Sequence, residues 1–201
     1  MTLPDLQTLV EPLTALIGLL NRLGVKGVIV GGVAVSLLGK PRFTADVDAV
    51  VHMPDDQLPS FLSRAREIGF APRVDDPVTF ARRHNIILLK HNPTGIGIDI
   101  SMALLPFEVE LISRATPVTI GSLTFAIPTP EDLIIMKAVA HRSQDLIDIE
   151  AIRTAHPTLD MKRIRRWIRE FARVLHTPEI AADVERIMKQ FKKSKKGHGK
   201  H

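Results

Sequence analysis

A glycine pair followed by two alternating aspartates constrains this chain more than any other feature. The segment at residues 27–51 reads GVIVGGVAVSLLGKPRFTADVDAVV, in which an apolar run ends at Gly31 and Gly32 and a short helical stretch leads to a second apolar run. Successive side chains of a strand point to opposite faces, so Asp46 and Asp48 lie on the same face of the second run. The sequence therefore predicts two neighbouring carboxylates on a strand that follows a glycine turn.

Two carboxylates at this spacing repel each other unless water, a proton or a cation offsets their charge. Mg²⁺ takes oxygen ligands and is commonly held by one or two carboxylates together with the phosphates of a substrate. Glycines have no Cβ, which lets backbone N–H groups approach a phosphate at the start of a helix, and the hydroxyl of Ser36 is a further candidate ligand one turn later. Two solvated acids at an exposed strand end are the alternative interpretation.

The complete motif resembles the signature of the DNA polymerase β-like nucleotidyltransferase superfamily, in the small bacterial branch that includes abortive-infection-type toxins of type IV toxin–antitoxin systems. Its residues in this chain are Gly31, Gly32, Arg42, Thr44, Asp46 and Asp48. The resemblance implies that the glycine pair, with Arg42 and Thr44, binds a nucleoside triphosphate (NTP), that the two aspartates bind Mg²⁺, and that a later strand supplies a third carboxylate.

Asp99 is the expected third carboxylate. Residues 85–91 form an apolar run, a turn with the sequence NPTG follows, and residues 96–102 alternate in strand fashion, which predicts an antiparallel hairpin. Asp99 lies in the middle of the second strand, where a charged side chain is unusual. The resemblance implies that Asp99 binds the catalytic metal and takes a proton from the attacking hydroxyl, whereas an edge-strand acid facing water is the alternative.

A second region of resemblance covers residues 129–149. The sequence TPED predicts a capped helix start, and the residues from there to Asp148 resemble the second conserved region of the same bacterial branch. The resemblance implies that Lys137 reaches the triphosphate and that Asp148 supports this lysine or the acceptor. In one unbroken helix these two residues would lie about three turns apart on nearly one face. A lysine that extends its amine into water is the alternative for Lys137, Asp145 is expected to cap the next helix, and Gln144 replaces a lysine common in relatives.

The net charge of +5 is concentrated near the C-terminus. Residues 160–201 carry 13 Lys and Arg against 5 Asp and Glu, whereas residues 1–159 carry 14 against 17. A two-faced helix is expected at residues 160–175, with a basic stripe formed by Lys162, Arg166, Arg169 and Arg173 and flanked by Arg163 and Arg165. Such clustering is typical of a protein with a polyanionic partner, and an RNA or tRNA acceptor would fit. A solvated helix face and a solubilising tail are the alternatives.

Composition and spacing exclude several classes. The chain has no cysteine and therefore neither disulfides nor thiolate metal sites, and a cytoplasmic location is expected. No segment has the pattern of a transmembrane run or a signal peptide, so we expect no membrane partner. The eight histidines lack the spacing of a zinc site, and the G-x-S-x-G elbow of serine hydrolases does not occur.

We therefore predict an α+β fold in which helices back a small mixed β-sheet nucleotidyltransferase core and a helical part follows at the C-terminus. The expected division is a core at residues 1–128 that includes an N-terminal helix at 5–23, a helical part at 129–190, and a basic flexible tail at 191–201. Further helices are expected at residues 54–68, 77–83 and 106–114, and two strands within residues 116–127.

The expected function is transfer of a nucleoside monophosphate (NMP) from an NTP to an acceptor hydroxyl. The resemblance implies two Mg²⁺ ions at the three aspartates, Lys137 at the leaving pyrophosphate, and a possible role as a toxin controlled by an antitoxin protein. A non-catalytic nucleotide- or RNA-binding protein of the same fold, acting as partner in a toxin–antitoxin pair, is the main alternative. A basic helical interaction protein with solvated acids is the third.

Overall fold

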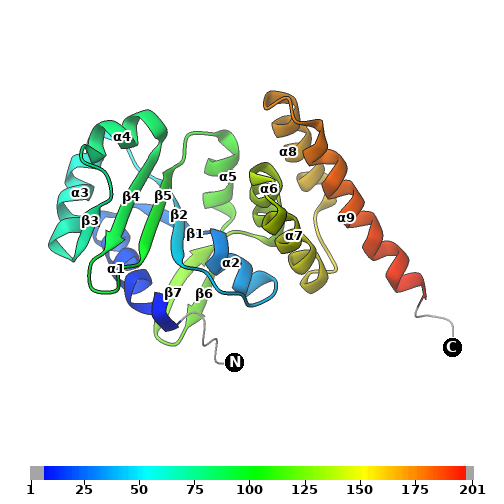
Figure 1. Cartoon of the computed structure of the whole chain (residues 1–201), viewed down its shortest axis with the longest axis horizontal. Helices are drawn as coiled ribbons and strands as arrows, with labels where there is room; N and C mark the ends of the chain where they lie inside the picture. The colour runs from blue at the N-terminus through cyan, green and yellow to red at the C-terminus, as the bar shows by residue number, and fades with distance from the viewer. Residues whose placement is uncertain (1–6, 198–201) are drawn as a thin grey trace. The chain divides into compact units, whose positions relative to one another are not determined.

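The computed structural model describes residues 7–197, which form two compact units (Figure 1). The core unit comprises the described residues up to Ala34 together with Pro41–Pro128. The helical unit comprises Val35–Lys40 together with the described residues from Thr129 onward. A mixed sheet in the first unit and helices in the second confirm the α+β fold expected from the sequence.

The core unit is built on a five-stranded sheet with the order β1-β2-β5-β4-β3. Its strands are β1 (Lys26–Ile29), β2 (Asp46–His52), β3 (Phe70–Pro72), β4 (Ile86–His91) and β5 (Gly97–Met102). β2 and β5 run parallel, and the other neighbouring pairs are antiparallel, so the hairpin expected from the sequence is β4–β5. The central strands are apolar on both faces except where the aspartates interrupt them, and Val47, Ile98 and Ile100 are fully buried.

Helices and a small hairpin complete the core unit. They are α1 (Gln7–Leu23), α3 (Leu58–Glu67), α4 (Pro77–His84), α5 (Pro106–Arg114), and the hairpin of β6 (Thr116–Ile120) with β7 (Leu123–Ile127). α1 and α5 pack on β2, while α3 packs on β3 and α4 packs on β4. The apolar stripe of α1 that the sequence shows is buried at Leu9, Leu13 and Leu16.

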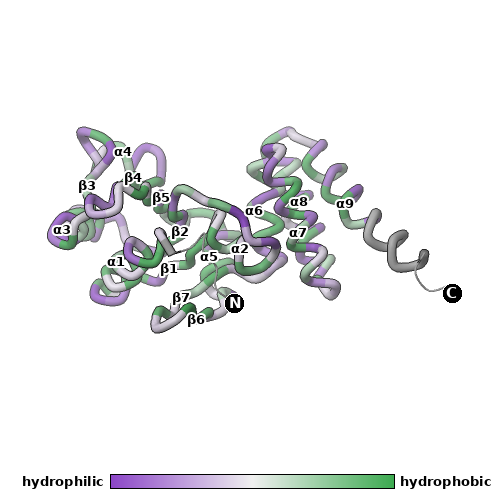
Figure 2. Tube along the Cα trace, turned by 60° about the horizontal axis from the view of Figure 1, so that its bottom comes forward, coloured by the Kyte–Doolittle hydropathy of each residue, from purple (hydrophilic) through white to green (hydrophobic). Residues whose placement is uncertain are grey.

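The helical unit contains α6 (Pro130–Ala140), α7 (Ser143–Ala155), α8 (Met161–Val174) and α9 (Pro178–Gly197). α6 contacts each of the other three helices. Thr129 caps α6 by accepting a hydrogen bond from the backbone N–H of Asp132 at 3.2 Å, as the sequence predicted. Figure 2 shows the turns of α8 alternating between hydrophobic and hydrophilic colours, which fits a helix with one buried face.

α2 (Gly31–Leu38) is divided between the units, since its first four residues belong to the core unit and the next four to the helical unit. Near its end, the carbonyl oxygen of Leu38 lies 2.7 Å from Nε2 of His156 in the helical unit. The helix begins at Gly31, so the glycine pair forms its first turn.

One strand and one helix end differ from the sequence-based expectation. β3 was not predicted, because three residues are too few to show alternation. α9 continues to Gly197, beyond residue 191 where a flexible tail was expected, since lysine and glutamine favour helix. The expected first residues of the N-terminal helix and the last four of the tail lie outside the described residues. No helix in the described range is long and apolar enough to span a bilayer.

Candidate active site

The glycine turn between β1 and α2 leaves space for two polar side chains. Gly31 has φ +58°, a conformation that suits glycine, and a Cβ on it would lie well under 3.0 Å from Oδ2 of Asp48. A Cβ on Gly32 would likewise lie under 3.0 Å from Oγ1 of Thr44. The backbone also joins these segments, because the N–H of Val30 donates to the carbonyl oxygen of Asp48 at 2.9 Å. The two glycines therefore have a steric role beside the phosphate contact that the sequence suggested.

Two of the three predicted carboxylates lie on adjacent strands in direct register. Asp48 on β2 pairs with Asp99 on the parallel strand β5, and Asp46 pairs with Gly97. Register partners project to the same face of a sheet. A Cβ on Gly97 would lie 2.5 Å from Oδ1 of Asp46, so this glycine makes room for the first aspartate. The structure thus brings Asp46, Asp48 and Asp99 to one region of the sheet.

Arg73 lies among these acids and was not singled out in the sequence. Its guanidinium donates a hydrogen bond to Oδ1 of Asp99 and forms an ion pair with it. Burial raises the pKa of the Asp99 carboxyl above its ordinary value; the nearby charge of Asp46 acts in the same direction, and Arg73 opposes both. Arg73 directly follows β3, so its proximity to Asp99 could be inferred only if that short strand were recognised.

The three aspartates offer the chemistry of a magnesium site, because Mg²⁺ prefers carboxylate oxygens. Within residues 7–197, no three His, Asp or Glu side chains are gathered closely enough to hold a metal ion as they stand. Asp99 points to Arg73, so its carboxylate would have to exchange a guanidinium for the ion. The donor set therefore fits Mg²⁺ by residue type and strand position, and a side-chain rearrangement would be needed to complete it.

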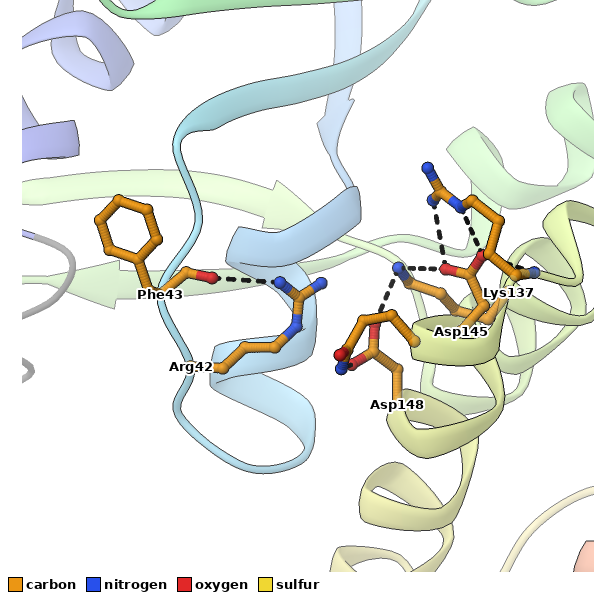
Figure 3. Close-up of polar contacts among 7 residues, drawn as sticks. Arg42, Phe43, Lys137, Asp145 and Asp148 are labelled. Carbon is orange, nitrogen blue, oxygen red and sulfur yellow. Dashed lines mark hydrogen bonds and ion pairs between the residues drawn. The ribbon is translucent and has the colours of Figure 1, made fainter.

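The predicted nucleotide-binding residues of the glycine motif differ in exposure. The Thr44 hydroxyl faces Gly32 and donates to the carbonyl oxygen of Asp46 at 3.3 Å. Nη1 of Arg42 donates to the carbonyl oxygen of Phe43 at 3.1 Å (Figure 3). Ser36 is only 3% exposed, on the part of α2 that belongs to the helical unit. Their contact with an NTP stays a prediction.

Lys137 and two aspartates form a buried ionic cluster in the helical unit (Figure 3). Nζ of Lys137 lies 2.9 Å from Oδ1 of Asp145 and 2.9 Å from Oδ2 of Asp148, and all three side chains are at most 7% exposed. Arg142 adds a bond from Nε to Oδ2 of Asp145 at 2.7 Å, and Gln144 donates to Oδ1 of Asp148 at 3.0 Å. Lys137 is thus held by Asp148, the acid expected to support it, and by Asp145.

The geometry of this cluster depends on a break between two helices, which agrees with the expectation that Asp145 caps a new helix. α6 ends at Ala140, the next residue His141 adopts the left-handed conformation with φ 51°, and α7 begins at Ser143. This break brings Asp148 against Lys137, whereas a continuous helix would separate them by about three turns. Asp145 does cap the start of α7, because its Oδ2 accepts the backbone N–H of Arg142 at 3.1 Å.

The basic stripe of α8 is narrower than the sequence indicated. Arg163 forms a buried ion pair with Asp132 at 2.6 Å, and Arg165 pairs with Glu185 at 2.5 Å. These two arginines therefore connect α8 to α6 and α9. The exposed basic residues of α8 are Lys162, Arg166, Arg169 and Arg173. Arg166 lies over the Trp167 ring at 4.8 Å, and Arg173 pairs with Glu170.

The sheet order, the glycine turn and the adjacent carboxylates together have the arrangement of a nucleotidyltransferase fold. Residues 5–196 match a family described as "Nucleotidyltransferase of unknown function (DUF6036)", and the chain belongs to this family. The toxin–antitoxin branch suggested by the motif is a finer assignment that this match does not make.

Two solved structures share the fold. One is an antigenic nucleotidyltransferase-like protein from Paracoccidioides brasiliensis, with 20% identity, a TM-score of 0.52 and coverage of 90% of this chain and 93% of that protein. The other is the lincosamide antibiotic adenylyltransferase LnuA with lincomycin bound, with 15% identity, a TM-score of 0.52 and coverage of 73% and 97%. At these identities the likeness concerns the fold. A comparison with curated proteins finds no match.

Proposed function

We propose that this protein catalyses Mg²⁺-dependent transfer of an NMP from an NTP to an acceptor hydroxyl. The observation that carries the proposal is the register of Asp48 with Asp99, beside a glycine turn whose missing side chains make room for Asp48 and Thr44. Membership of a nucleotidyltransferase family supports the same reaction class. Clustered acids on an apolar sheet are costly to the fold, and a cation-dependent reaction gives them a function.

In this proposal the residues of the core unit position the nucleotide and the acceptor. The backbone of Gly31 and Gly32, with Thr44 and Arg42, binds the phosphates. Ser36, which belongs to the helical unit, is a further candidate. Asp46, Asp48 and Asp99 would hold two Mg²⁺ ions. When bound, Mg²⁺ offsets the charge on the phosphate oxygens and orients them for attack.

The reaction itself is a substitution at the α-phosphorus. Asp99 accepts the proton of the acceptor hydroxyl, whose oxygen forms the new bond to phosphorus as the bond to pyrophosphate breaks. Lys137 is proposed to neutralise the leaving pyrophosphate, with Asp148 and Asp145 holding its ammonium in place. The protein thereby contributes positioning and electrostatic stabilisation.

For the acceptor we propose an RNA, with tRNA as the first candidate. The supporting observation is the exposed basic stripe on α8, because closely spaced lysine and arginine side chains attract phosphate backbones. An RNA-modifying toxin that an antitoxin restrains would use such an acceptor. A small-molecule acceptor is the second candidate, since the lincosamide adenylyltransferase LnuA shares the fold.

Label transfer tests the proposal directly. The purified protein is incubated with each α-labelled NTP, Mg²⁺ and total cellular RNA, in parallel with Asp46→Ala and with Asp56→Ala. Asp56 is an exposed aspartate of the same unit and provides a matched control. Label that reaches RNA with the wild type and Asp56→Ala but not with Asp46→Ala would support the proposal and identify the preferred nucleotide.

Two other outcomes separate the alternatives. Label on a small molecule from an acceptor panel, but not on RNA, would retain the enzyme and replace its acceptor. Mg²⁺-dependent NTP binding without any labelled product, with Mn²⁺ tried as well, would instead favour the non-catalytic nucleotide-binding protein.

A further inference from the structure

Arg73 reaches Asp99 across an intervening strand. Its backbone N–H donates to the carbonyl oxygen of Leu88 at 2.9 Å, which extends the β3–β4 ladder by one residue. Leu88 in turn is the register partner of Asp99 on β5, and Asp99 is the partner of Asp48 on β2. Arg73, Leu88, Asp99 and Asp48 therefore form one row across four strands. Two strand spacings separate Arg73 from Asp99, about 10 Å, a gap that a long side chain is needed to bridge.

The guanidinium of Arg73 also lies close to a second carboxylate. A Cβ placed on Gly97 would lie 2.5 Å from Oδ1 of Asp46 and 3.5 Å from Nη1 of Arg73, so both groups approach the same point above this glycine. The ion pair of Arg73 with Asp99 is one-third exposed on each side, which leaves it open to competing ions. The guanidinium thus lies where a cation bound by these aspartates would carry its charge.

We infer that Arg73 is an internal counter-cation that competes with divalent metal for the Asp99 carboxylate. This inference rests on the proposed function, because it requires the three aspartates to bind metal. A divalent ion entering the cluster must displace the guanidinium from Asp99, and the positive charge of Arg73 repels the ion until it moves away. Metal without nucleotide is therefore bound weakly. An NTP supplies further oxygen ligands, so metal and nucleotide together can displace Arg73.

This competition predicts that removal of the Arg73 guanidinium strengthens the binding of divalent metal in the absence of nucleotide. Arg73→Ala is expected to bind Mn²⁺ at least about tenfold more tightly than the wild type, since a charge-assisted hydrogen bond no longer has to be broken. Arg73→Gln keeps part of the stem without the charge and is expected to behave alike. Arg73→Lys keeps the charge but reaches less far toward Asp99, so its Mn²⁺ affinity is expected to lie between that of the wild type and that of the two uncharged variants.

The test is a Mn²⁺ titration followed by electron paramagnetic resonance, without nucleotide and again with a non-hydrolysable NTP analogue. Arg82→Ala is the matched control, because Arg82 forms an ion pair with Asp55 at 3.0 Å in the same unit and touches none of the three site aspartates. Circular dichroism shows whether each variant folds, and Arg73→Gln replaces Arg73→Ala if the latter does not.

The outcomes distinguish this inference from the proposed function. Tighter Mn²⁺ binding by Arg73→Ala and Arg73→Gln, with Arg82→Ala like the wild type, supports the competition. If the wild type binds Mn²⁺ and the folded Arg73 variants bind it equally or more weakly, the inference is overturned while the metal site stands. Absence of Mn²⁺ binding by all proteins, with or without nucleotide, overturns the metal role of the aspartates and this inference with it.

Discussion

The buried cluster around Lys137 allows a quantitative prediction. Lys137→Met keeps an apolar stem of similar length but removes the ammonium between Asp145 and Asp148, which are 1% and 2% exposed. Removing one partner of a buried ion pair typically costs about 3–5 kcal/mol, because the other charge is left uncompensated. Asp145 keeps Arg142 and Asp148 keeps Gln144, so we expect a loss near the lower limit, about 3 kcal/mol.

The single tryptophan of the chain provides the assay. Trp167 lies on α8 in the helical unit and is 7% exposed, so its fluorescence reports unfolding of the unit that contains the cluster. With a urea dependence of about 2 kcal/mol per molar, a loss of about 3 kcal/mol lowers the unfolding midpoint by roughly 1.5 M. Lys162→Met, at an exposed lysine of the same unit, is the matched control and should leave the midpoint nearly unchanged.

The pH dependence of the unfolding free energy gives a second, independent check of the role of the Lys137 charge. Burial acts to raise the pKa of the Asp145 carboxyl, but hydrogen bonds from Arg142 and Lys137 outweigh burial and lower it. A carboxyl whose pKa is lowered in the folded state stabilises the protein at pH values above its ordinary pKa. This contribution disappears as the pH falls through the pKa of the folded state. In Lys137→Met the pKa of Asp145 rises, so this carboxyl takes up its proton at higher pH than in the wild type.

The difference in unfolding free energy between wild type and variant should therefore be largest near neutral pH and narrow as the pH falls toward about 4. A difference below about 1 kcal/mol at pH 7 would contradict the proposed cost of the unpaired carboxylates, which rests on the buried-pair magnitude. A difference that stays constant between neutral and acidic pH would show that lost packing, not lost charge, causes the destabilisation.

Three further predictions address other parts of the chain. Gly31→Ala should abolish NMP transfer while lowering stability by about 1–2 kcal/mol, because the new methyl group displaces Asp48 and strains a residue at φ +58°; unchanged turnover would contradict the steric role. Arg169→Ala should weaken RNA binding equally for all sequences and reduce the salt dependence measured by filter binding by about one unit; a sequence-selective loss would argue against backbone contact. Thr129→Ala should cost about 1 kcal/mol in thermal unfolding through loss of the hydrogen bond from the N–H of Asp132, and a neutral effect would show that the α6 cap is dispensable.

Local patterns were sufficient to predict the parts of the fold that depend on neighbouring residues. Alternation along one strand placed Asp46 and Asp48 on one face, and an acid interrupting an apolar run identified Asp99 as a candidate partner. Turn and capping residues located the β4–β5 hairpin and the start of α6. These features follow from rules that act over a few residues, so a single sequence contains them.

The remaining features depend on contacts between distant segments. Arg73 meets Asp99 only because the three-residue strand β3 pairs with β4, and a strand of that length has no recognisable period. The interactions of Arg163 and Arg165 were missed because Asp132 and Glu185 lie on other helices. An amphipathic pattern shows which helix face is charged, but it does not show which charges are neutralised by a partner.

The space for the candidate site is created by residues that have no side chain at all. A methyl group on Gly31, Gly32 or Gly97 would collide with Asp48, Thr44 or Asp46 respectively. Each of these polar groups can therefore be displaced without changing its own chemistry, by adding a single carbon atom to its neighbour. Glycine-to-alanine substitutions at the three positions would provide a steric map of the site in which every functional group stays intact, and would separate the importance of where a carboxylate lies from the importance of its presence.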